Sequence, residues 1–286
     1  MAQVSRALRK SFLLLCPTRL RMHLLNAHPN LRKAAPAGMK FVYFHYLGSL
    51  AVNIDTKYKV ERIMWTGIYE APLVRWLEGL QTKGWTCFDV GANVGAITLV
   101  LGRLVGNEGK VYAFEPGLPN LSRLKHNFQL NPELMPRVHI VPVGVGETAG
   151  ELWWSEEKAN PGNALLSSTG TQRTYVISLD DFVKKQFISR VDFIKIDVEG
   201  MELDVMRGAA QLLRTSRPAI YFETLDRYLR AGGGAVFADF KRLLVGELGY
   251  GLFKLNSSGK LSPLTDNGNT GYTVAVHPQN PAILRA

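Results

Sequence analysis

The amino-acid sequence predicts an α/β fold in which a mostly parallel β-sheet is covered by helices on both faces. Two observations lead to this prediction. Short apolar runs typical of strands alternate with segments of helical periodicity over most of the chain. Turns that carry glycine or acidic residues follow several of these runs directly, as in Asp89-Val90-Gly91-Ala92-Asn93-Val94-Gly95. Parallel strands need crossover connections, and helical crossovers bury both faces of the sheet.

The alternation can be followed element by element. The first β-like runs are at 41–44 and 50–52, and residues 69–80 have helical periodicity. The main strands are expected at 85–90, 110–114, 138–143, 191–196 and 219–222. The helices between and after these strands are expected at 94–105, 119–130, 202–213 and 235–248.

Two parts of the chain depart from this alternation. Residues 144–178 are rich in Gly, Ser and Thr, and we expect strands or loops inserted there at the edge of a cleft. The last two strands are expected at 251–255 and 272–276. The short linker between them contains Gly, Ser, Asn and Pro, which favours a hairpin over a helical crossover. The sequence therefore predicts an antiparallel strand at the edge of the sheet.

Positive charge is concentrated at the N-terminus. The formal net charge is +10, and the Lys and Arg residues that precede Asp55, the first acidic residue, contribute +8 of it. We therefore divide the chain into a basic N-terminal extension, 1–40, and one main domain, 41–286. The main domain is close to neutral, which does not favour a nucleic-acid interface. Apolar residues of the extension recur at helical spacing, as in a peripheral membrane anchor, a targeting segment or a helix packed on the main domain.

Cysteine content and hydropathy bear on the compartment of the protein. The two cysteines, Cys16 and Cys87, form neither a disulfide framework nor a paired metal-binding spacing, which fits a reducing compartment. No run approaches the roughly 18 apolar residues that a membrane span needs. We therefore expect a cytoplasmic protein, which is membrane-peripheral if the extension serves as an anchor. The sequence does not indicate an oligomeric state.

The turn at 89–95 has the features of a ligand site. Gly91 allows a sharp turn and a close approach to a ligand, and Gly95 allows the next helix to pack close to the sheet. Free N–H groups at the start of that helix favour an anionic group. The dinucleotide fingerprint G-x-G-x-x-G is absent, because Asn93 stands where its middle glycine would be. Asp89 would repel a pyrophosphate and attract a cation, which favours S-adenosylmethionine, with its ammonium and sulfonium groups, over a dinucleotide.

Acidic residues follow two further strands. Glu115 lies twenty residues after Gly95, the separation expected for an acid that binds ribose hydroxyls. Asp197 and Glu199 follow an apolar strand at the edge where open α/β folds bind ligands. These two acids could orient a cofactor, accept a proton or hold a metal. Alternatively, Asp197 caps the next helix, and Glu199 and Glu202 complement its dipole.

Four motifs together resemble the FkbM family of S-adenosylmethionine-dependent methyltransferases. They are DVGANVG at 89–95, AFEP at 113–116, SLDDFV at 178–183 and FIKIDVEGMELDVMRGA at 193–209. The upstream GIYE at 67–70 is also similar to that family. The resemblance covers about residues 60–225 and implies the seven-stranded, Rossmann-like fold of class I methyltransferases. It also implies O-methylation of a hydroxyl on a polyketide, sugar, lipid or other small molecule.

The resemblance implies roles for individual residues as well. The methionine end of S-adenosylmethionine would be surrounded by Asp89, Gly91, Asn93 and Gly95. Glu70 would lie near the cofactor, and Asp197 would be a further cofactor-binding residue. Glu115 would hold the ribose. Val145 would border the adenine, with Glu147 as a nearby acid.

Methyl transfer to a hydroxyl needs alignment of the reacting atoms and a proton acceptor. We expect Asp197 or Glu199 to accept the proton, with His126 and His139 as weaker alternatives. The histidines have no paired spacing, and we expect no metal site. Two other functions fit parts of the pattern. One is a non-catalytic module that keeps the cofactor pocket and docks through the basic extension, and the other is an NAD-dependent dehydrogenase.

Overall fold

The computed structural model of the chain describes residues 40–46, 50–66, 69–157, 160–166, 172–224, 236–265, 271–280 and 283. The basic extension, apart from its last residue, lies outside the described residues, and so does its expected membrane contact. Within the described ranges, no helix combines the length and the apolar character needed to cross a membrane.

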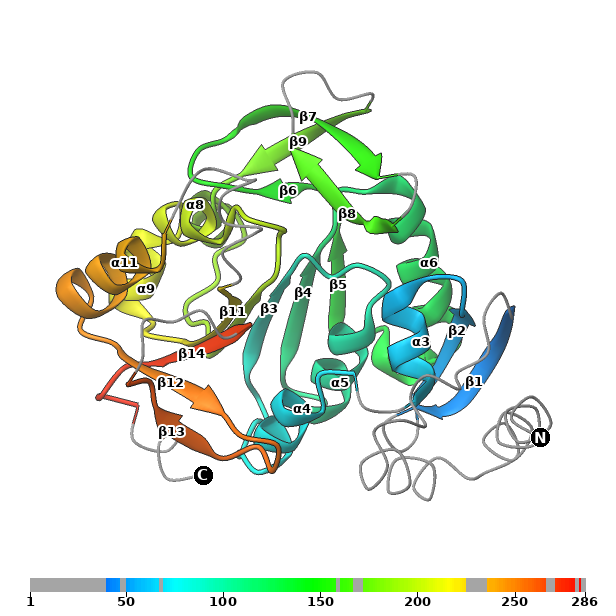
Figure 1. The fold of residues 1–286 in the computed structure, drawn as a ribbon, viewed down its shortest axis with the longest axis horizontal. Helices are drawn as coiled ribbons and strands as arrows, with labels where there is room; N and C mark the ends of the chain where they lie inside the picture. Colours follow the sequence, from blue (N-terminus) through cyan, green and yellow to red (C-terminus); the bar gives the residue numbers. More distant parts are fainter. Residues whose placement is uncertain are drawn as a thin grey trace, which may run out of the picture.

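An eight-stranded sheet forms the centre of the fold, in the order β13-β12-β14-β11-β10-β3-β4-β5 (Figure 1). The strands are β3 (Thr86–Val90), β4 (Lys110–Phe114), β5 (Val138–Val141), β10 (Phe193–Ile196), β11 (Ala219–Glu223), β12 (Gly251–Leu255), β13 (Leu261–Pro263) and β14 (Tyr272–Val276). The strands from β11 to β5 pair in parallel, as the alternating pattern predicts. The mostly parallel α/β fold is therefore confirmed.

The antiparallel part of the sheet differs in detail from the prediction. Strands β12 and β14 pair antiparallel, as expected. However, β14 lies between β11 and β12, and the edge is formed by the short strand β13, which adds an eighth strand. The extra strand forms because Asn256 closes a tight turn: its side-chain oxygen accepts hydrogen bonds from the N–H groups of Ser258 (3.0 Å) and Lys260 (2.9 Å). An asparagine that bonds its own backbone in this way reverses the chain within a few residues.

Helices cover both faces of the sheet. On one face lie α4 (Ala71–Glu78), α5 (Ala96–Leu104) and α6 (Leu118–Gln129), which share a hydrophobic core with strand β2 (Leu50–Asp55) and helix α3 (Lys59–Thr66). On the other face lie α7 (Leu179–Lys185), α8 (Glu202–Arg207), α9 (Ala210–Thr215), α11 (Phe237–Phe240) and the π-helical turn η3 (Lys241–Glu247). Alternate residues of each central strand enter the two cores, which explains why these strands are mostly apolar.

The helix expected at 202–213 is divided into α8 and α9 at Gly208. A Cβ atom at Gly208 would lie 2.1 Å from the carbonyl oxygen of Gly146, so the two backbones are in contact there. Asp180 then gives α9 a cap of its own, because its carboxylate accepts hydrogen bonds from the N–H groups of Gln211 (2.9 Å) and Leu212 (2.8 Å). The single-helix prediction was wrong because this contact joins segments far apart in the sequence.

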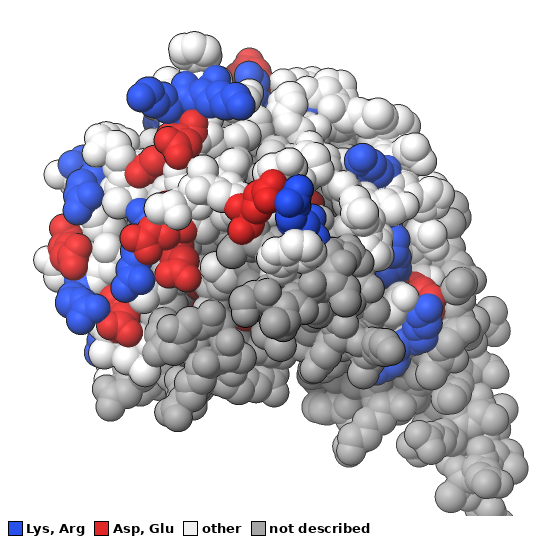
Figure 2. Space-filling model, turned by 90° about the horizontal axis from the view of Figure 1, so that it is seen from above, with Lys and Arg blue, Asp and Glu red and all other residues white. Residues whose placement is uncertain are grey.

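The segment after β5 was expected to form strands or loops, and it forms strands. A second sheet has the order β6-β9-β7-β8 and lies at the top of Figure 1. Its strands are β6 (Gly144–Val145), β7 (Gly150–Glu157), β8 (Asn160–Leu166) and β9 (Gln172–Ile177). Strands β1 (Lys40–Tyr46) and β2 form a separate two-stranded antiparallel sheet at the start of the domain, and the 3-10 turn η2 (Pro132–Leu134) follows α6. On the face shown in Figure 2, basic and acidic side chains lie interspersed.

Candidate active site

The turn after β3 has an unusual backbone. Gly91, Asn93 and Gly95 have φ values of 78°, 51° and 87°, and the N–H groups of Gly91 and Ala92 both bond to the carbonyl oxygen of Phe114 on β4. Among the described residues, only five non-glycine residues have positive φ, and three of them are expected site residues: Glu70, Asn93 and Glu199. Such conformations are energetically unfavourable for residues with a Cβ and gather at functional sites.

The two glycines of the turn also make close contacts with distant segments. The φ of 78° at Gly91 agrees with the sharp turn expected there. In addition, a Cβ at Gly91 would lie 1.9 Å from the carbonyl oxygen of Asp197, so this glycine allows the end of the neighbouring strand to approach. A Cβ at Gly95 would lie 2.4 Å from Leu124 of α6, so the close packing at Gly95 is against a helix and not against the sheet.

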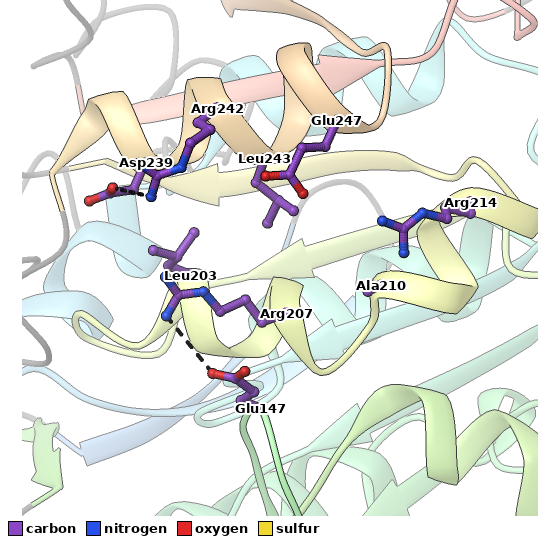
Figure 3. Close-up of a pocket in the computed structure, with 9 residues that line it drawn as sticks. All are labelled: Glu147, Leu203, Arg207, Ala210, Arg214, Asp239, Arg242, Leu243 and Glu247. Atoms are coloured by element: carbon purple, nitrogen blue, oxygen red, sulfur yellow. Dashed lines mark hydrogen bonds and ion pairs between the residues drawn. The ribbon is translucent and has the colours of Figure 1, made fainter.

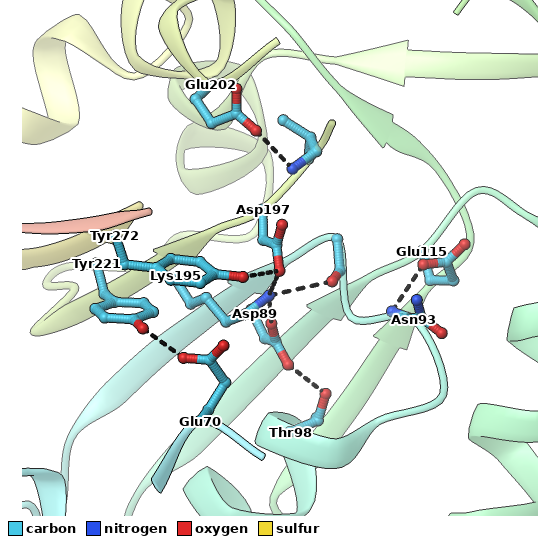
Figure 4. Close-up of polar contacts among 12 residues, drawn as sticks. Glu70, Asp89, Asn93, Thr98, Glu115, Lys195, Asp197, Glu202, Tyr221 and Tyr272 are labelled. Atoms are coloured by element: carbon cyan, nitrogen blue, oxygen red, sulfur yellow. Dashed lines mark hydrogen bonds and ion pairs between the residues drawn. The ribbon is translucent and has the colours of Figure 1, made fainter. Parts of the chain in front are cut away.

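Below the turn, Asp89 is part of a fully buried network (Figure 4). Its carboxylate accepts a hydrogen bond from the hydroxyl of Thr98 at 2.6 Å and lies 3.5 Å from the ammonium of Lys195. The same ammonium is 3.3 Å from the carboxylate of Asp197 and donates to the carbonyl oxygen of Gly91 at 3.3 Å. The cation that Asp89 meets in this structure is thus Lys195.

Charge and burial oppose each other in this network. Burial raises the pKa of Asp89, and Lys195 and Thr98 act in the opposite direction. Burial lowers the pKa of Lys195, but Asp197, Asp89 and Glu70 together raise it above its ordinary value. Lys195 is therefore charged at neutral pH, and it compensates acids that would otherwise be buried without a counter-ion.

Lys195 was given no role in the sequence-based assignment. The sequence does contain an indication that Lys195 belongs to the site. A single lysine inside the apolar run Phe193–Ile196 must be buried and paired if the run is a central strand. Its partner Asp89 lies directly opposite on β3 in the parallel register.

Two stacked tyrosines extend the network to Glu70. Tyr221 on β11 and Tyr272 on β14 stack with ring centroids 4.8 Å apart and planes 9° apart. Tyr221 donates a hydrogen bond to Glu70, and Tyr272 donates to Asp197 at 3.3 Å. Burial raises the pKa of Glu70. Glu70, Asp89 and Asp197 are thereby brought together by residues that sequence patterns did not single out: Thr98, Lys195, Tyr221 and Tyr272.

Glu115 lies on the other side of the turn. One carboxylate oxygen accepts the N–H of Asn93 at 2.8 Å, and the other accepts the N–H of Gly117 at 2.9 Å. Burial raises the pKa of Glu115, and these two amides oppose the shift. Each carboxylate oxygen has further acceptor capacity, so the group can still receive hydroxyl donors. Asn93 and Glu115, two residues expected to bind different parts of the cofactor, are therefore in direct contact through the backbone N–H of Asn93 (Figure 4).

The loop after β10 is held by Glu202 rather than by Asp197. Glu202 accepts the N–H groups of Val198 (3.0 Å) and Gly200 (3.2 Å), and burial raises its pKa to about 7. No side-chain cap bonds the start of α8, which excludes the alternative in which Asp197 caps that helix. In the part of the chain that the structure describes, no group of three or more His, Cys, Asp or Glu residues is arranged to hold a metal ion.

The remaining candidates lie away from this network. Val145 is buried in the core shared with α7 to α9. Glu147 lines a pocket of about 310 Å³ between α8, α9, α11 and η3, where it pairs with Arg207 at 3.8 Å (Figure 3). His139 stacks on Tyr112 at 4.9 Å between centroids, and burial lowers its pKa. His126 is on the exposed side of α6.

Comparison with known proteins identifies the family of the chain. Residues 89–251, more than half of the chain, match the model of the methyltransferase FkbM domain. The hexuronic acid methyltransferase AglP of Haloferax volcanii is 27% identical over 45% of this chain and 51% of its own length. Methyltransferase 1 of Beauveria bassiana is 28% identical over 42% of this chain and 56% of its own length. The chain thus spans about half the length of these curated relatives.

A solved structure of a methyltransferase FkbM from Methylobacillus flagellatus KT matches with a TM-score of 0.45 and 16% identity, over 75% of this chain and 54% of that one. The family match, by contrast, rests on the sequence, and it includes the turn, Glu115 and the strand with Lys195 and Asp197. The chain belongs to the FkbM methyltransferase family.

Proposed function

We propose that this protein is an S-adenosylmethionine-dependent O-methyltransferase whose acceptor is a hydroxyl of a small molecule, sugar, lipid or polyketide. The observation that carries the proposal is the meeting of Asp89, Glu115 and Asp197 at the carboxyl ends of three adjacent parallel strands. Open α/β folds bind ligands at this edge. Membership of the FkbM family and the name of the relative from Haloferax volcanii support the reaction class.

The side chains of the site fit the proposed cofactor chemically. Glu115 is held by two backbone amides, so it is a fixed acceptor for the two ribose hydroxyls. Glu70, Asn93 and Asp197 are proposed to hold the methionine end, and Val145 to border the adenine. Asp89, Gly91 and Gly95 shape the turn from below, because their contacts are with the protein. When bound, S-adenosylmethionine supplies a methyl group on a cationic sulfur.

We infer that Asp197 or Glu199 accepts the proton of the acceptor hydroxyl. One oxygen of Asp197 is engaged by Lys195 and Tyr272, which fixes the orientation of the carboxylate. Glu199 stands at the start of the next loop with a φ of 56°. A carboxylate held in one orientation is prepared to receive a proton without rearrangement.

The experiment that tests the proposal has two steps. Binding of S-adenosylmethionine and S-adenosylhomocysteine to the full chain is measured by calorimetry, and transfer of a labelled methyl group is then measured on neutral glycosides, uronic acids, phenols and long-chain alcohols. Methyl transfer to any hydroxyl supports the proposal. Binding without transfer on the whole panel indicates the non-catalytic module, and binding of NAD without S-adenosylhomocysteine binding indicates the dehydrogenase.

We expect Glu115→Gln to weaken binding of S-adenosylhomocysteine by about 100-fold, because hydrogen bonds to a charged acceptor contribute about 1.5–3 kcal/mol each. Calorimetry measures the change. Glu108→Gln, on an exposed loop, is the matched control and leaves binding unchanged. Unchanged binding in Glu115→Gln would remove this residue from the site.

We expect Asp197→Asn to lower kcat by about 10²–10⁴-fold, the usual contribution of a positioned proton acceptor, with a smaller change in cofactor affinity. Steady-state kinetics and calorimetry on the same samples separate the two effects. Asp204→Asn, at a partly exposed acid on α8 that pairs with Arg207, is the control. A loss of cofactor binding as large as that in Glu115→Gln would contradict the catalytic assignment of Asp197.

The division into a basic extension at 1–40 and a domain at 41–286 is a second proposal, supported by the +8 charge that precedes Asp55. We propose that the extension binds anionic membranes peripherally. Co-sedimentation of the full chain with vesicles that contain phosphatidylserine, but not with pure phosphatidylcholine, would support it, and so would release by salt. Equal sedimentation with both kinds of vesicle would contradict it.

A further inference from the structure

Glu223 is a buried acid that the proposed mechanism does not use. It ends strand β11, and only 7% of its surface is exposed. The parallel register pairs Ile196 with Phe222, so Glu223, the last residue of β11, lies beside Asp197, which directly follows β10. On its other side, Glu223 is paired with Tyr272 of β14. Glu223 is therefore located at the same edge of the sheet as the candidate active site.

In the part of the chain that the structure describes, no hydrogen-bond or ion-pair partner compensates Glu223. Among the described residues, its carboxyl group makes no hydrogen bond or ion pair with another side chain or amide. The charged groups that face it are Asp197 on β10, Glu199 and Glu202 after β10, and Lys195. Lys195 is already engaged by Asp89, Asp197 and the carbonyl of Gly91. Tyr272 donates its hydroxyl to Asp197 rather than to Glu223.

An ionised carboxylate in this position would be unfavourable. A buried charge without a partner loses its hydration, and three neighbouring acids add repulsion at the same place. Burial, followed by Asp197, Glu199 and Glu202, raises the pKa of Glu223 to about 9, and Lys195 opposes the shift. A carboxylic acid kept neutral at pH 7 differs from a carboxylate in one decisive way: it can donate a hydrogen bond.

We propose that Glu223 is a neutral carboxylic acid that donates a hydrogen bond to an uncharged, hydroxyl-bearing methyl acceptor. This inference about Glu223 rests on the proposed function and specifies the class of its substrate. Glu223 positions the acceptor, whereas Asp197 or Glu199 receives the proton. Among the described residues, an anionic acceptor would meet Asp197, Glu199 and Glu202 with a single, already compensated lysine, so carboxylate and phosphate acceptors are disfavoured.

The protonation state is tested on the protein alone by infrared spectroscopy. At about pH 8, above the value of about 7 for Glu202 and below that of about 9 for Glu223, the carbonyl band of a protonated carboxylic acid is expected. The band should lose intensity in Glu223→Gln and as the pH rises through about 9, and it should keep its intensity in Glu202→Gln. A wild-type protein without this band, or a band that is as intense in Glu223→Gln as in wild type, would overturn the proposal.

Stability gives a second readout that needs no ligand. The folded-state pKa of Glu223 is raised, so above its ordinary value of 4.5 the unfolded chain releases a proton that the folded chain retains. The free energy of unfolding should therefore fall as the pH rises from about 4.5 towards about 9. This fall should be smaller in Glu223→Gln. Parallel profiles for wild type and variant would overturn the proposal.

Acceptor class is tested with a matched pair of probes on the protein loaded with S-adenosylhomocysteine. Methyl β-D-glucopyranoside and the corresponding methyl glucuronoside differ only at C6, which carries an uncharged hydroxyl in the first and belongs to a carboxylate in the second. Calorimetry at about pH 7 should show at least about tenfold tighter binding of the neutral probe, because like charges in a buried site repel. Equal binding, preference for the uronate, or no binding of either probe would overturn the proposal.

Two variants test whether Glu223 contributes to binding of the neutral probe. Glu223→Gln keeps a neutral donor and should bind the glucopyranoside within about twofold of wild type, whereas Glu223→Leu should bind it about tenfold more weakly. Above about pH 9 the wild-type protein, but not Glu223→Gln, should lose affinity. Because binding is measured without methyl transfer, failure of this inference is distinguishable from failure of the proposed reaction. Equal affinity of Glu223→Leu and wild type would overturn it.

Discussion

The Lys195→Met variant is expected to lose about 3–5 kcal/mol of unfolding free energy, the usual effect of removing one partner of a buried ion pair. Lys195 is 2% exposed and is the cation next to Asp89, which is fully buried, and next to Asp197. Without the ammonium, these acids must either remain charged in a low-dielectric interior or take up protons. Chemical unfolding followed by circular dichroism measures the loss.

The pH dependence of this variant follows from the same contacts. Burial raises the pKa of Asp89, and Lys195 acts against this shift. Removing Lys195 raises that pKa further, so the folded variant binds more protons than its unfolded chain over a wider range. Its stability should therefore fall with rising pH above the ordinary carboxyl range more steeply than that of wild type.

Two further variants test whether the loss of stability in Lys195→Met comes from the uncompensated buried acids. Lys83→Met removes an exposed lysine and should change stability by less than about 0.5 kcal/mol. Adding Asp89→Asn to Lys195→Met removes the uncompensated charge and should restore part of the loss. A loss below about 1 kcal/mol in Lys195→Met would show that the network does not depend on its cation.

The Gly91→Ala variant is expected to lose about 2–5 kcal/mol, from two separate sources. The φ of 78° costs a residue with a Cβ about 1–2 kcal/mol. The added methyl group would lie 1.9 Å from the carbonyl oxygen of Asp197, and the neighbouring backbone would have to move, at a cost of about 1–3 kcal/mol. Cofactor affinity should fall with stability, because the displaced backbone carries Asp197.

Gly84 provides the matched control for this variant. Its φ is 79°, but no atom lies within 4 Å of the position of a Cβ. Gly84→Ala should therefore show only the backbone contribution, about 1–2 kcal/mol, and leave cofactor binding unchanged. Equal losses in the two variants would contradict the role assigned to the contact between Gly91 and Asp197.

Local sequence pattern predicted most of the central sheet. The strands β3, β4, β11, β12 and β14 lie within one or two residues of their expected positions, because each is a short apolar run bounded by polar or glycine-bearing turns. The errors fall where distant segments meet. Gly208 divides a helix because Gly146 contacts it, and β13 forms because Asn256 closes a turn.

In the candidate site, too, features of single strands are predictable from the sequence, whereas contacts between distant segments are not. Asp89, Glu115 and Asp197 are recognisable in the sequence because each directly follows or ends a strand, and parallel strands bring such positions to one edge. The direct contact of Asn93 with Glu115 agrees with that expectation. The assignment of each acid to cofactor or acceptor stays a prediction until binding and turnover are measured.

The tertiary structure determined what each acid meets. Asp89 is neutralised by a lysine 106 residues away in the sequence, and Glu70 is bound by a tyrosine 151 residues away. Strand pairing creates these contacts, and no local pattern encodes them. The order of the elements and the family follow from periodicity and motifs, which are properties of short segments. The charge state of a buried acid such as Glu223 depends on every group that folding places around it, so its position at the end of a strand is visible in the sequence but its protonation is decided by the folded protein.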